Sequence, residues 1–440
     1  MSTLRRFNPY ALPDATIDRL ATGRQEVLED IVRHAEANLR SRPVQHVQIV
    51  APRGFGKSFL MRMVQSALRC KRENGWPVAV TLLPEEQRNV RRPHLFLEEI
   101  RRVLEGRPAS DLRVRWSEAH PQWDTGVVAL DAAVVKKVGP NGLLIVIVEN
   151  FDHLLTTVFR ESNDQMQLRG WLSREASRIM LLTTALRQVD TDYAKPLFQA
   201  FTQLRLPPWT EEDCLAFFDR VRAHATLETL SDGERARARA IAVFSGGSPR
   251  IATVLYEVLQ TKDALTAAAV LDKLVDELSD YYRNRIDLLS PRAQDVLDTL
   301  LRLGEPRSQT EVAAAMGQSQ SRVAEVFGEL TSDQILSDHP AATSRATLYQ
   351  ATDRLMVHFY RTRYFDPERR VSALEAITDF LAGFFSTEEL RSEAQRLHAA
   401  GHSHEANVFE RLPRRELQSW VGGTLFSMDI SRDITTPLLR

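Results

Sequence analysis

The sequence of 440 residues is poor in cysteine, nearly neutral in charge and free of long apolar runs. Its two cysteines, Cys70 and Cys214, lack the spacing of a metal site, which argues against a disulfide framework and favours a reducing, cytoplasmic environment. A formal net charge of −1 means that binding to nucleic acid requires a local basic patch. No apolar segment approaches the roughly 20 residues that cross a bilayer, so we expect no membrane partner.

The composition that remains is typical of a packed globular protein. Hydrophobic residues make up 43% of the chain and charged residues 26%, and the length suffices for two or three domains. Apolar runs at 76–83, 143–148, 179–185 and 204–206 alternate with helical patterns. This alternation predicts an α/β fold, with a parallel sheet that carries helices on both faces.

Residues 46–60 form the most informative segment, a P-loop pattern. A short apolar strand leads into a glycine-containing turn, and Lys57-Ser58 begins an amphipathic helix. Gly54 and Gly56 allow the backbone to point several N–H groups at phosphate oxygens, and the helix N-terminus adds its dipole. Lys57 is expected to reach the β- and γ-phosphates, and the Ser58 hydroxyl to ligate Mg²⁺. The expected nucleotide-binding residues of this loop are Pro52, Arg53, Gly54, Phe55, Gly56, Lys57, Ser58 and Phe59.

A second motif, Glu149-Asn150-Phe151-Asp152, directly follows the apolar run 143–148. Ligands of open α/β sheets bind at the carboxyl ends of strands, so these groups are expected near the P-loop. Glu149 can hold Mg²⁺, whereas Asn150 can position a water molecule but cannot accept its proton. We therefore expect slow hydrolysis, or hydrolysis that needs a partner.

From about Thr210 the pattern becomes helical, and a Gly-Gly-Ser-Pro-Arg turn begins a further helix near Arg250. An arginine gains no stabilisation from the helix dipole at a helix N-terminus, so we expect Arg250 to interact with another group, such as a γ-phosphate. The predicted domains are a P-loop ATPase core with its lead-in, a helical lid, a winged helix, and a helical extension with a tail. Their residue ranges are 1–209, 210–280, 281–365 and 366–440.

These features together resemble AAA+/STAND-type P-loop ATPases with a C-terminal winged helix, and more narrowly archaeal replication-initiator ATPases and related prokaryotic ATPases. The resemblance rests on Gly23-Arg24, the P-loop, the Glu-Asn-x-Asp strand end, a Leu-Leu-Thr-Thr strand and the Arg250 turn, over roughly residues 7–365. It implies that Arg24 lies near the adenine, that Thr183 or Thr184 senses the γ-phosphate, and that Arg250 is a second sensor. We take Glu149, Asn150, Thr184 and Arg250 as the catalytic set.

An arginine finger is expected shortly before the last core strand of such proteins, but only Lys195 stands between Tyr193 and Gln203. Arg169 and Arg187 are possible substitutes. Arginines also cluster ahead of and within the helical pattern near residue 100, where they can either grip phosphate or form a solvated face. This cluster comprises Arg88, Arg91, Arg92, Arg101 and Arg102.

The predicted winged helix has a recognition helix at 319–330. Ser319, Gln320, Ser321 and Arg322 could hydrogen-bond to bases, but one arginine against two nearby glutamates gives little positive charge for phosphate contact. DNA readout and a docking or autoinhibitory role both stay open. The C-terminal 75 residues are expected to be helical and to pack on the winged helix or on a partner, with a partly free tail from residue 428.

Two functions compete. The first is a slowly hydrolysing ATP switch, using ATP and Mg²⁺, whose nucleotide state positions the winged helix and which engages a protein partner or a second copy of itself. The alternative is an initiator-like protein that binds double-stranded DNA and in which ATP stabilises the DNA-bound conformation. A metabolic kinase is disfavoured, since neither an acceptor site nor a catalytic aspartate motif is evident.

Overall fold

The computed structural model divides the chain into two compact units, Asn8–Pro207 and Pro208–Arg440 together with Met1–Phe7. The structure describes residues 9–83, 90–108, 123–186, 195–256, 258–260, 264–304, 306–340, 346–364, 378–410, 417–421 and 424–428. The boundary between the units lies beside the one expected at 209/210. The finer boundaries at 280 and 365 stay predictions.

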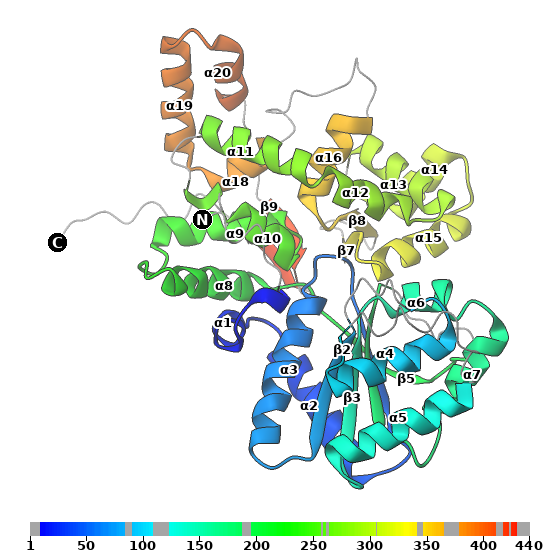
Figure 1. Ribbon diagram of the computed structural model, residues 1–440. Helices are drawn as coiled ribbons and strands as arrows, with labels where there is room; N and C mark the ends of the chain where they lie inside the picture. Colours follow the sequence, from blue (N-terminus) through cyan, green and yellow to red (C-terminus); the bar gives the residue numbers. More distant parts are fainter. Residues whose placement is uncertain are drawn as a thin grey trace. The chain divides into compact units, whose positions relative to one another are not determined.

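A five-stranded parallel sheet forms the centre of the first unit (Figure 1). Its strand order is β2-β3-β4-β1-β5. The strands are β1 (His46–Val50), β2 (Val78–Leu83), β3 (Leu143–Val148), β4 (Ile179–Ala185) and β5 (Phe201–Arg205). All residues of β3 and β4 are buried, as continuous apolar runs in a covered parallel sheet should be. The predicted P-loop-type α/β sheet is confirmed, although its last strand begins at Phe201 rather than at residue 204.

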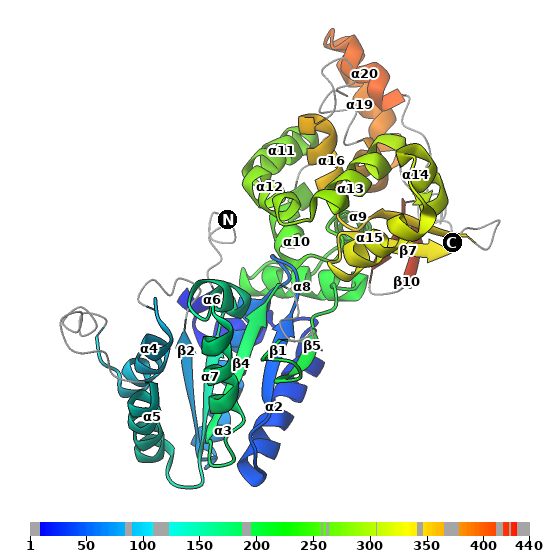
Figure 2. The same cartoon turned by 90° about the vertical axis from the view of Figure 1, so that its right-hand side faces the viewer.

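Helices cover both faces of this sheet, as predicted. Residues of two helices build the apolar core on one face, and residues of four helices build the core on the other. The first pair is α2 (Gln25–Arg40) and α3 (Lys57–Glu73); the other four are α4 (Pro93–Glu105), α5 (Trp123–Val138), α6 (Phe151–Thr157) and α7 (Ser162–Leu172). Figure 2 shows the strands between these helices. The short segments η1 (Pro9–Ala11) and α1 (Asp14–Leu20) pack on α3.

The second unit begins with helices whose N-termini are capped by their own side chains. Thr210 and Ser231 each form a reciprocal capping box with an acid three residues later, which satisfies two otherwise unpaired backbone donors. The helices are α8 (Glu211–His224), α9 (Asp232–Phe244), α10 (Pro249–Leu255), η3 (Val258–Gln260), α11 (Ala264–Glu277) and α12 (Ser279–Asp287). Gly247 must be glycine, since it has φ +70° and an added Cβ would lie 2.7 Å from the Trp209 carbonyl oxygen.

The next elements follow the order helix, short strand, two helices and antiparallel hairpin. They are α13 (Pro291–Leu303), β6 (Arg307–Ser308), α14 (Gln309–Met316), α15 (Gln320–Ser332), β7 (Leu336–Pro340) and β8 (Thr347–Ala351), which α16 (Arg354–Tyr364) follows. The three strands form one sheet in the order β6-β8-β7. The helices and the hairpin lie where the sequence places them.

The C-terminal extension contains the expected helices and also a hairpin that was not expected. The helices are α18 (Thr378–Phe384), α19 (Thr387–Ala399) and α20 (Ser403–Glu410). They precede the antiparallel strands β9 (Leu417–Val421) and β10 (Thr424–Met428). In the sequence a Gly-Gly pair separates the two strands, which is a signal for a two-residue hairpin turn. The expectation of helix throughout was therefore wrong here. The first residue of the predicted tail, Met428, belongs to β10, and residues 429–440 lie outside the described residues.

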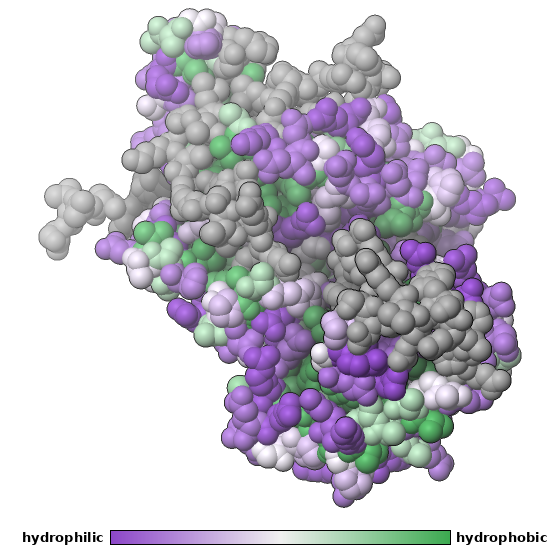
Figure 3. Space-filling model, in the orientation of Figure 1, coloured by the Kyte–Doolittle hydropathy of each residue, from purple (hydrophilic) through white to green (hydrophobic). Residues whose placement is uncertain are grey.

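Hydrophilic residues cover much of the described surface that faces the viewer in Figure 3. The large hydrophobic side chains that are exposed include Val128 and Val135 on α5 and Met166 on α7. Within the described segments, no helix has both the length and the apolar character needed to cross a membrane.

His46 links three elements of the first unit through a buried imidazole. The Leu181 N–H donates to Nδ1 at 3.0 Å, so the ring is the Nε2–H tautomer, which donates to the Leu172 carbonyl oxygen at 3.0 Å. Burial, helped by the charge of Arg169, lowers the pKa of His46 to about 4. Only the neutral ring satisfies both contacts.

The stability of the first unit is therefore expected to depend on pH through His46. The folded-state pKa lies below the unfolded value, so the contribution is complete above about pH 6.5 and is lost as the pH falls toward 4. The loss amounts to about 3 kcal/mol by this linkage. Urea unfolding of wild type and His46→Gln between about pH 7 and about pH 4.5 measures it. The variant should be less stable but flatter in pH, while His153→Gln, at an exposed site, should keep the wild-type slope; equal slopes in all three proteins would contradict the assignment.

Candidate functional site

The P-loop connects β1 to α3 and carries two glycines in the left-handed region. Gly54 has φ +84° and Gly56 has φ +83°, conformations in which a side chain would be strained. Phe55 between them is buried in the core shared with α2 and α3. The loop is therefore fixed from within at Phe55, while both flanking glycines let its backbone turn.

Lys57 opens α3 and folds back over the loop that precedes it. Its Nζ donates to the carbonyl oxygens of Ala51 at 2.6 Å and Pro52 at 3.0 Å. These carbonyls stand in for the phosphate oxygens that a P-loop lysine binds. The ammonium is thus already held beside the loop.

Arg24 is buried at the start of α2 and contacts the P-loop. Its Nη2 donates to the Phe55 carbonyl oxygen at 3.1 Å, and its Nη1 donates to the Gly23 carbonyl oxygen at 2.6 Å. The resemblance implies a place near the adenine. The structure shows that the guanidinium supports the loop backbone.

Glu149, Asn150 and Thr184 come together where β3 and β4 end side by side. Glu149 is 5% exposed, and the Asn150 N–H donates to Thr184 Oγ1 at 3.2 Å. The strand register distinguishes the two threonines. Thr184 pairs with Ile49, which faces α2 and α3, whereas Thr183 pairs with Gln48 and faces the opposite side. Thr184 is therefore the threonine on the face of the P-loop helix.

Asn150 has φ +50° and ψ +49°, in the left-handed helical region. Asparagine adopts this region more readily than other residues with a β-carbon, because its side chain bonds locally. The turn from β3 into α6 imposes this conformation. The turn geometry thus disfavours glutamate, which could accept a proton, at position 150.

Two further residues at this edge were not singled out from the sequence. Asp152 accepts from the Leu186 N–H at 3.0 Å and so ties α6 to the end of β4. Arg62 lies one turn beyond Ser58 on α3 and holds the segment that contains η1. The Glu-Asn-x-Asp spacing contained a signal for Asp152. No local pattern marks Arg62.

The arginines predicted as a γ-phosphate sensor and as substitutes for an arginine finger belong to different parts of the chain. Arg250 belongs to the second unit, where its guanidinium lies over the Tyr281 ring at 5.2 Å from the centroid. Arg169 donates from Nη1 to the Phe198 carbonyl oxygen at 2.5 Å, a structural contact before β5. Arg187 lies outside the described residues.

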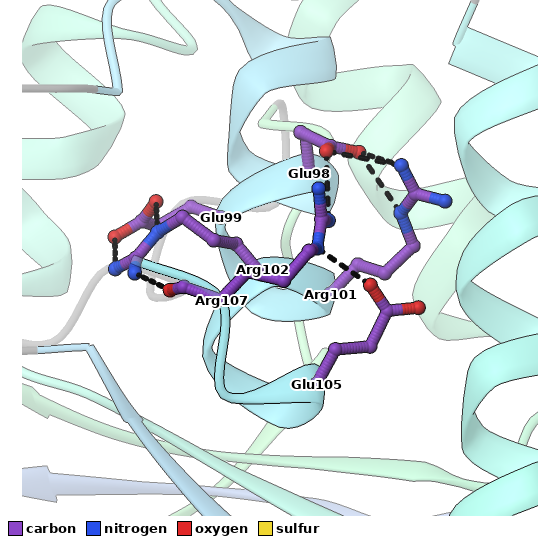
Figure 4. A network of polar contacts seen from close by, with 6 residues as sticks. All are labelled: Glu98, Glu99, Arg101, Arg102, Glu105 and Arg107. Atoms are coloured by element: carbon purple, nitrogen blue, oxygen red, sulfur yellow. Dashed lines mark hydrogen bonds and ion pairs between the residues drawn. The ribbon is translucent and has the colours of Figure 1, made fainter. Parts of the chain in front are cut away.

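The arginines of α4 are paired with glutamates rather than available for phosphate (Figure 4). Arg101 binds Glu98 through Nη2 at 2.7 Å, and Arg102 binds Glu99 through Nη2 at 2.7 Å. Arg107 joins the network through Glu98 at 2.9 Å. Arg101 and Arg102 therefore belong to a partly buried ion-pair network rather than to the solvated face that was one of the two alternatives. Arg88 lies outside the described residues.

The residues at this edge fit a nucleotide triphosphate with Mg²⁺. Left-handed glycines and Lys57 provide donors for phosphate, and Ser58 and Glu149 provide the hard oxygen ligands that Mg²⁺ takes. The Glu149 carboxylate is buried, so a bound cation would compensate a charge that water reaches poorly.

No protein-family model matches the chain, and no curated protein matches its sequence. Solved structures do resemble it. A Walker-type ATPase of Pyrococcus abyssi has a TM-score of 0.53 at 14% identity, over 78% of this chain and 96% of that one. The ORC1 protein of Aeropyrum pernix, solved in complex with DNA, has a TM-score of 0.41 at 16% identity, over 77% and 91%. RuvB T158V of Thermotoga maritima has a TM-score of 0.36 at 17% identity, over 75% and 92%. The likeness to the Walker-type ATPase confirms the predicted P-loop ATPase fold.

The left-handed turn at Asn150 predicts an unusual order of stabilities. Asn150→Gly should leave the free energy of unfolding nearly unchanged, because glycine adopts φ +50° freely. Asn150→Glu should lower it by ~1–2 kcal/mol, the cost of the left-handed conformation. Urea unfolding of the three proteins tests this; a glutamate variant as stable as wild type would show that the turn does not select asparagine.

Proposed function

We propose that this protein binds ATP with Mg²⁺, hydrolyses it slowly, and uses its nucleotide state to position its winged-helix segment. The observation that carries the proposal is the meeting of the P-loop, Glu149 and Thr184 at one edge of the sheet. Lys57 and the loop N–H groups bind phosphate, while Ser58 and Glu149 hold the metal. When bound, Mg²⁺ neutralises phosphate charge.

The same residues support a low rate. Asn150 lies beside Glu149 and can orient a water molecule through its amide, but it accepts no proton. The Thr184 hydroxyl is neutral and already accepts from the Asn150 N–H. With one carboxylate assigned to the metal, hydrolysis lacks a second proton acceptor among these residues, so the ATP-bound state is long-lived.

Elements α13 to β8 support a winged helix, since they follow its order of helix, strand, two helices and hairpin. At the start of α15 the side chains of Ser319, Gln320, Ser321 and Arg322 are exposed, as contact with DNA bases requires. This keeps DNA binding as the second candidate function. The exposed Glu325 on the same helix opposes phosphate contact, which favours docking to a protein or to a second copy of the chain. The free thiols of Cys70 and Cys214 support a reducing, cytoplasmic setting.

Arg250 remains a proposed sensor of the γ-phosphate. Within its own unit its cation–π contact to Tyr281 on α12 gives it an alternative partner. An exchange between these two partners would link nucleotide state to the second unit.

ATP binding is expected to depend on the Lys57 ammonium. Lys57→Ala should weaken the affinity for Mg-ATP at least tenfold, corresponding to ~1.5–3 kcal/mol for a charged hydrogen bond. Isothermal titration measures the affinity. Lys71→Ala, at the far end of α3 where the side chain lies over Trp76, is the matched control and should bind like wild type. Equal affinity of the Lys57 variant and wild type would refute the proposal.

Arg24 is expected to act on the loop rather than on the base. Arg24→Ala should weaken binding of Mg-ATP and of inorganic triphosphate by the same factor, about three- to tenfold, because both depend on the loop that its guanidinium supports. Competition titrations with the two ligands distinguish the roles. If only ATP affinity falls, Arg24 reads the adenine instead, as the resemblance implies.

A further inference from the structure

The turn that carries Arg250 touches the base of the β7–β8 hairpin through its backbone. This turn ends α9 and leads into α10, and Gly246 within it has φ +57°. A Cβ added to Gly246 would lie 2.3 Å from the Thr352 carbonyl oxygen and 3.1 Å from the Asp353 nitrogen. Thr352 and Asp353 connect β8 to α16. The two backbones are therefore in direct contact, with no room for a side chain at position 246.

Asp353 is the buried polar residue at this hairpin base and is only 2% exposed. Its Oδ1 accepts hydrogen bonds from the Met356 N–H at 3.1 Å and from the Tyr282 hydroxyl at 3.4 Å. Its Oδ2 lies 3.7 Å from Arg285 Nη1 and, within the described part of the chain, accepts no hydrogen bond. The charge of this carboxylate, which water does not reach, is therefore compensated by Arg285.

Arg285 holds both ends of the hairpin from α12. Besides its ion pair with Asp353, which follows β8, its Nη2 donates to the carbonyl oxygen of Gln334, which precedes β7, at 2.7 Å. Between the same two ends, the Thr352 N–H donates to the Ile335 carbonyl oxygen at 2.9 Å. One arginine thus fixes where the hairpin leaves α12.

The same helix also receives Arg250. The Arg250 guanidinium lies over the ring of Tyr281 on α12, and the centroid of that ring is 5.1 Å from the centroid of the Tyr282 ring. Tyr281 and Arg285 are four residues apart, so they lie on adjacent turns of one helix face. The Arg250 turn and the hairpin base therefore contact α12 within about one helical turn of each other.

Polar contacts of this kind fix an orientation more than they stabilise a fold. Apolar side chains in place of a buried ion pair are often neutral or stabilising, whereas an ion pair with added hydrogen bonds allows few arrangements. The close backbone contact at Gly246 limits the arrangements further. The orientation of the hairpin relative to the turn is therefore held by geometry as well as by burial.

We propose that these contacts, Gly246 against Thr352 and Arg285 against Asp353, form a joint that makes the Arg250 turn and the hairpin of the proposed winged helix move as one body. A displacement of the turn then reaches the hairpin, because the backbone contact leaves no free space and Arg285 holds both hairpin ends. That a nucleotide causes this displacement rests on the proposed function, whereas the joint itself does not.

Spin labels on either side of the joint test whether it is rigid. The reference protein carries Glu212→Cys on α8 and Ser321→Cys on α15, which are both exposed positions, together with Cys70→Ser. Double electron–electron resonance measures the distance distribution between the two labels without nucleotide. A rigid joint should give one narrow distribution.

Two variants of this reference protein separate the joint from other contacts of the unit. Arg285→Met with Asp353→Asn removes both charges together, so that no buried charge is left unpaired, and should broaden the distribution about twofold. Arg237→Gln breaks the ion pair of α9 with Glu389 and should keep the reference width. A reference distribution that is already broad, a double variant that stays narrow, or equal broadening in Arg237→Gln overturns the inference.

A second label pair distinguishes the joint from the proposed function. Glu29→Cys on α2 takes the place of Glu212→Cys, so that the distance runs from the first unit to α15. A non-hydrolysable ATP analogue with Mg²⁺ should shift this distance in the reference protein. The double variant should lose the shift while binding the analogue as tightly by isothermal titration, and a shift that it retains overturns the inference. A reference protein that binds the analogue without a shift contradicts the proposed function, while the first label pair still decides on the joint.

Discussion

Strand β1 is hydrogen-bonded to β4 on one side and to β5 on the other, and this position fixes where the P-loop begins. The ladder continues into the loop, since the Ala51 N–H donates to the Ala185 carbonyl oxygen at 3.3 Å. Strand β3 lies on the other side of β4, and Glu149 directly follows its last residue. The five strands of this sheet run parallel, so their carboxyl ends share one edge, and residues about a hundred positions apart meet there. The chemistry of the site thus depends on the strand order.

The sequence predicted this sheet well where burial is complete. β3 is a continuous apolar run, β4 is apolar up to Thr183, and the Lys-Ser pair marks the start of α3. The edge strand β5 was misplaced by three residues because its burial is incomplete and no continuous apolar run marks it. Thr183 and Thr184 could not be separated either. They are chemically identical neighbours on opposite faces, and only the register with β1 tells which one faces α3.

Some polar contacts leave a local signal in the sequence, and others do not. The pairing of Arg101 and Arg102 was readable, because each has a glutamate three residues earlier on the same helix. The contacts of Arg24 to Phe55 and of Arg62 to Pro9 span 31 and 53 residues and follow no periodicity. Such contacts depend on the packing of the folded unit. A sequence pattern can therefore identify the P-loop but not the arginines that hold its surroundings.

Asn150 shows how backbone geometry and reaction chemistry constrain one another. The turn from β3 into α6 needs a left-handed residue at the edge of the sheet where the P-loop begins. Asparagine meets this need at low cost, while glutamate would strain the backbone. A residue favoured by the turn then lacks the proton acceptor that rapid hydrolysis needs. This is consistent with the proposed function. A switch works only if its ATP-bound state lasts longer than the contacts that depend on that state. Slow hydrolysis, which follows from the asparagine that the turn favours at position 150, gives the ATP-bound state this lifetime.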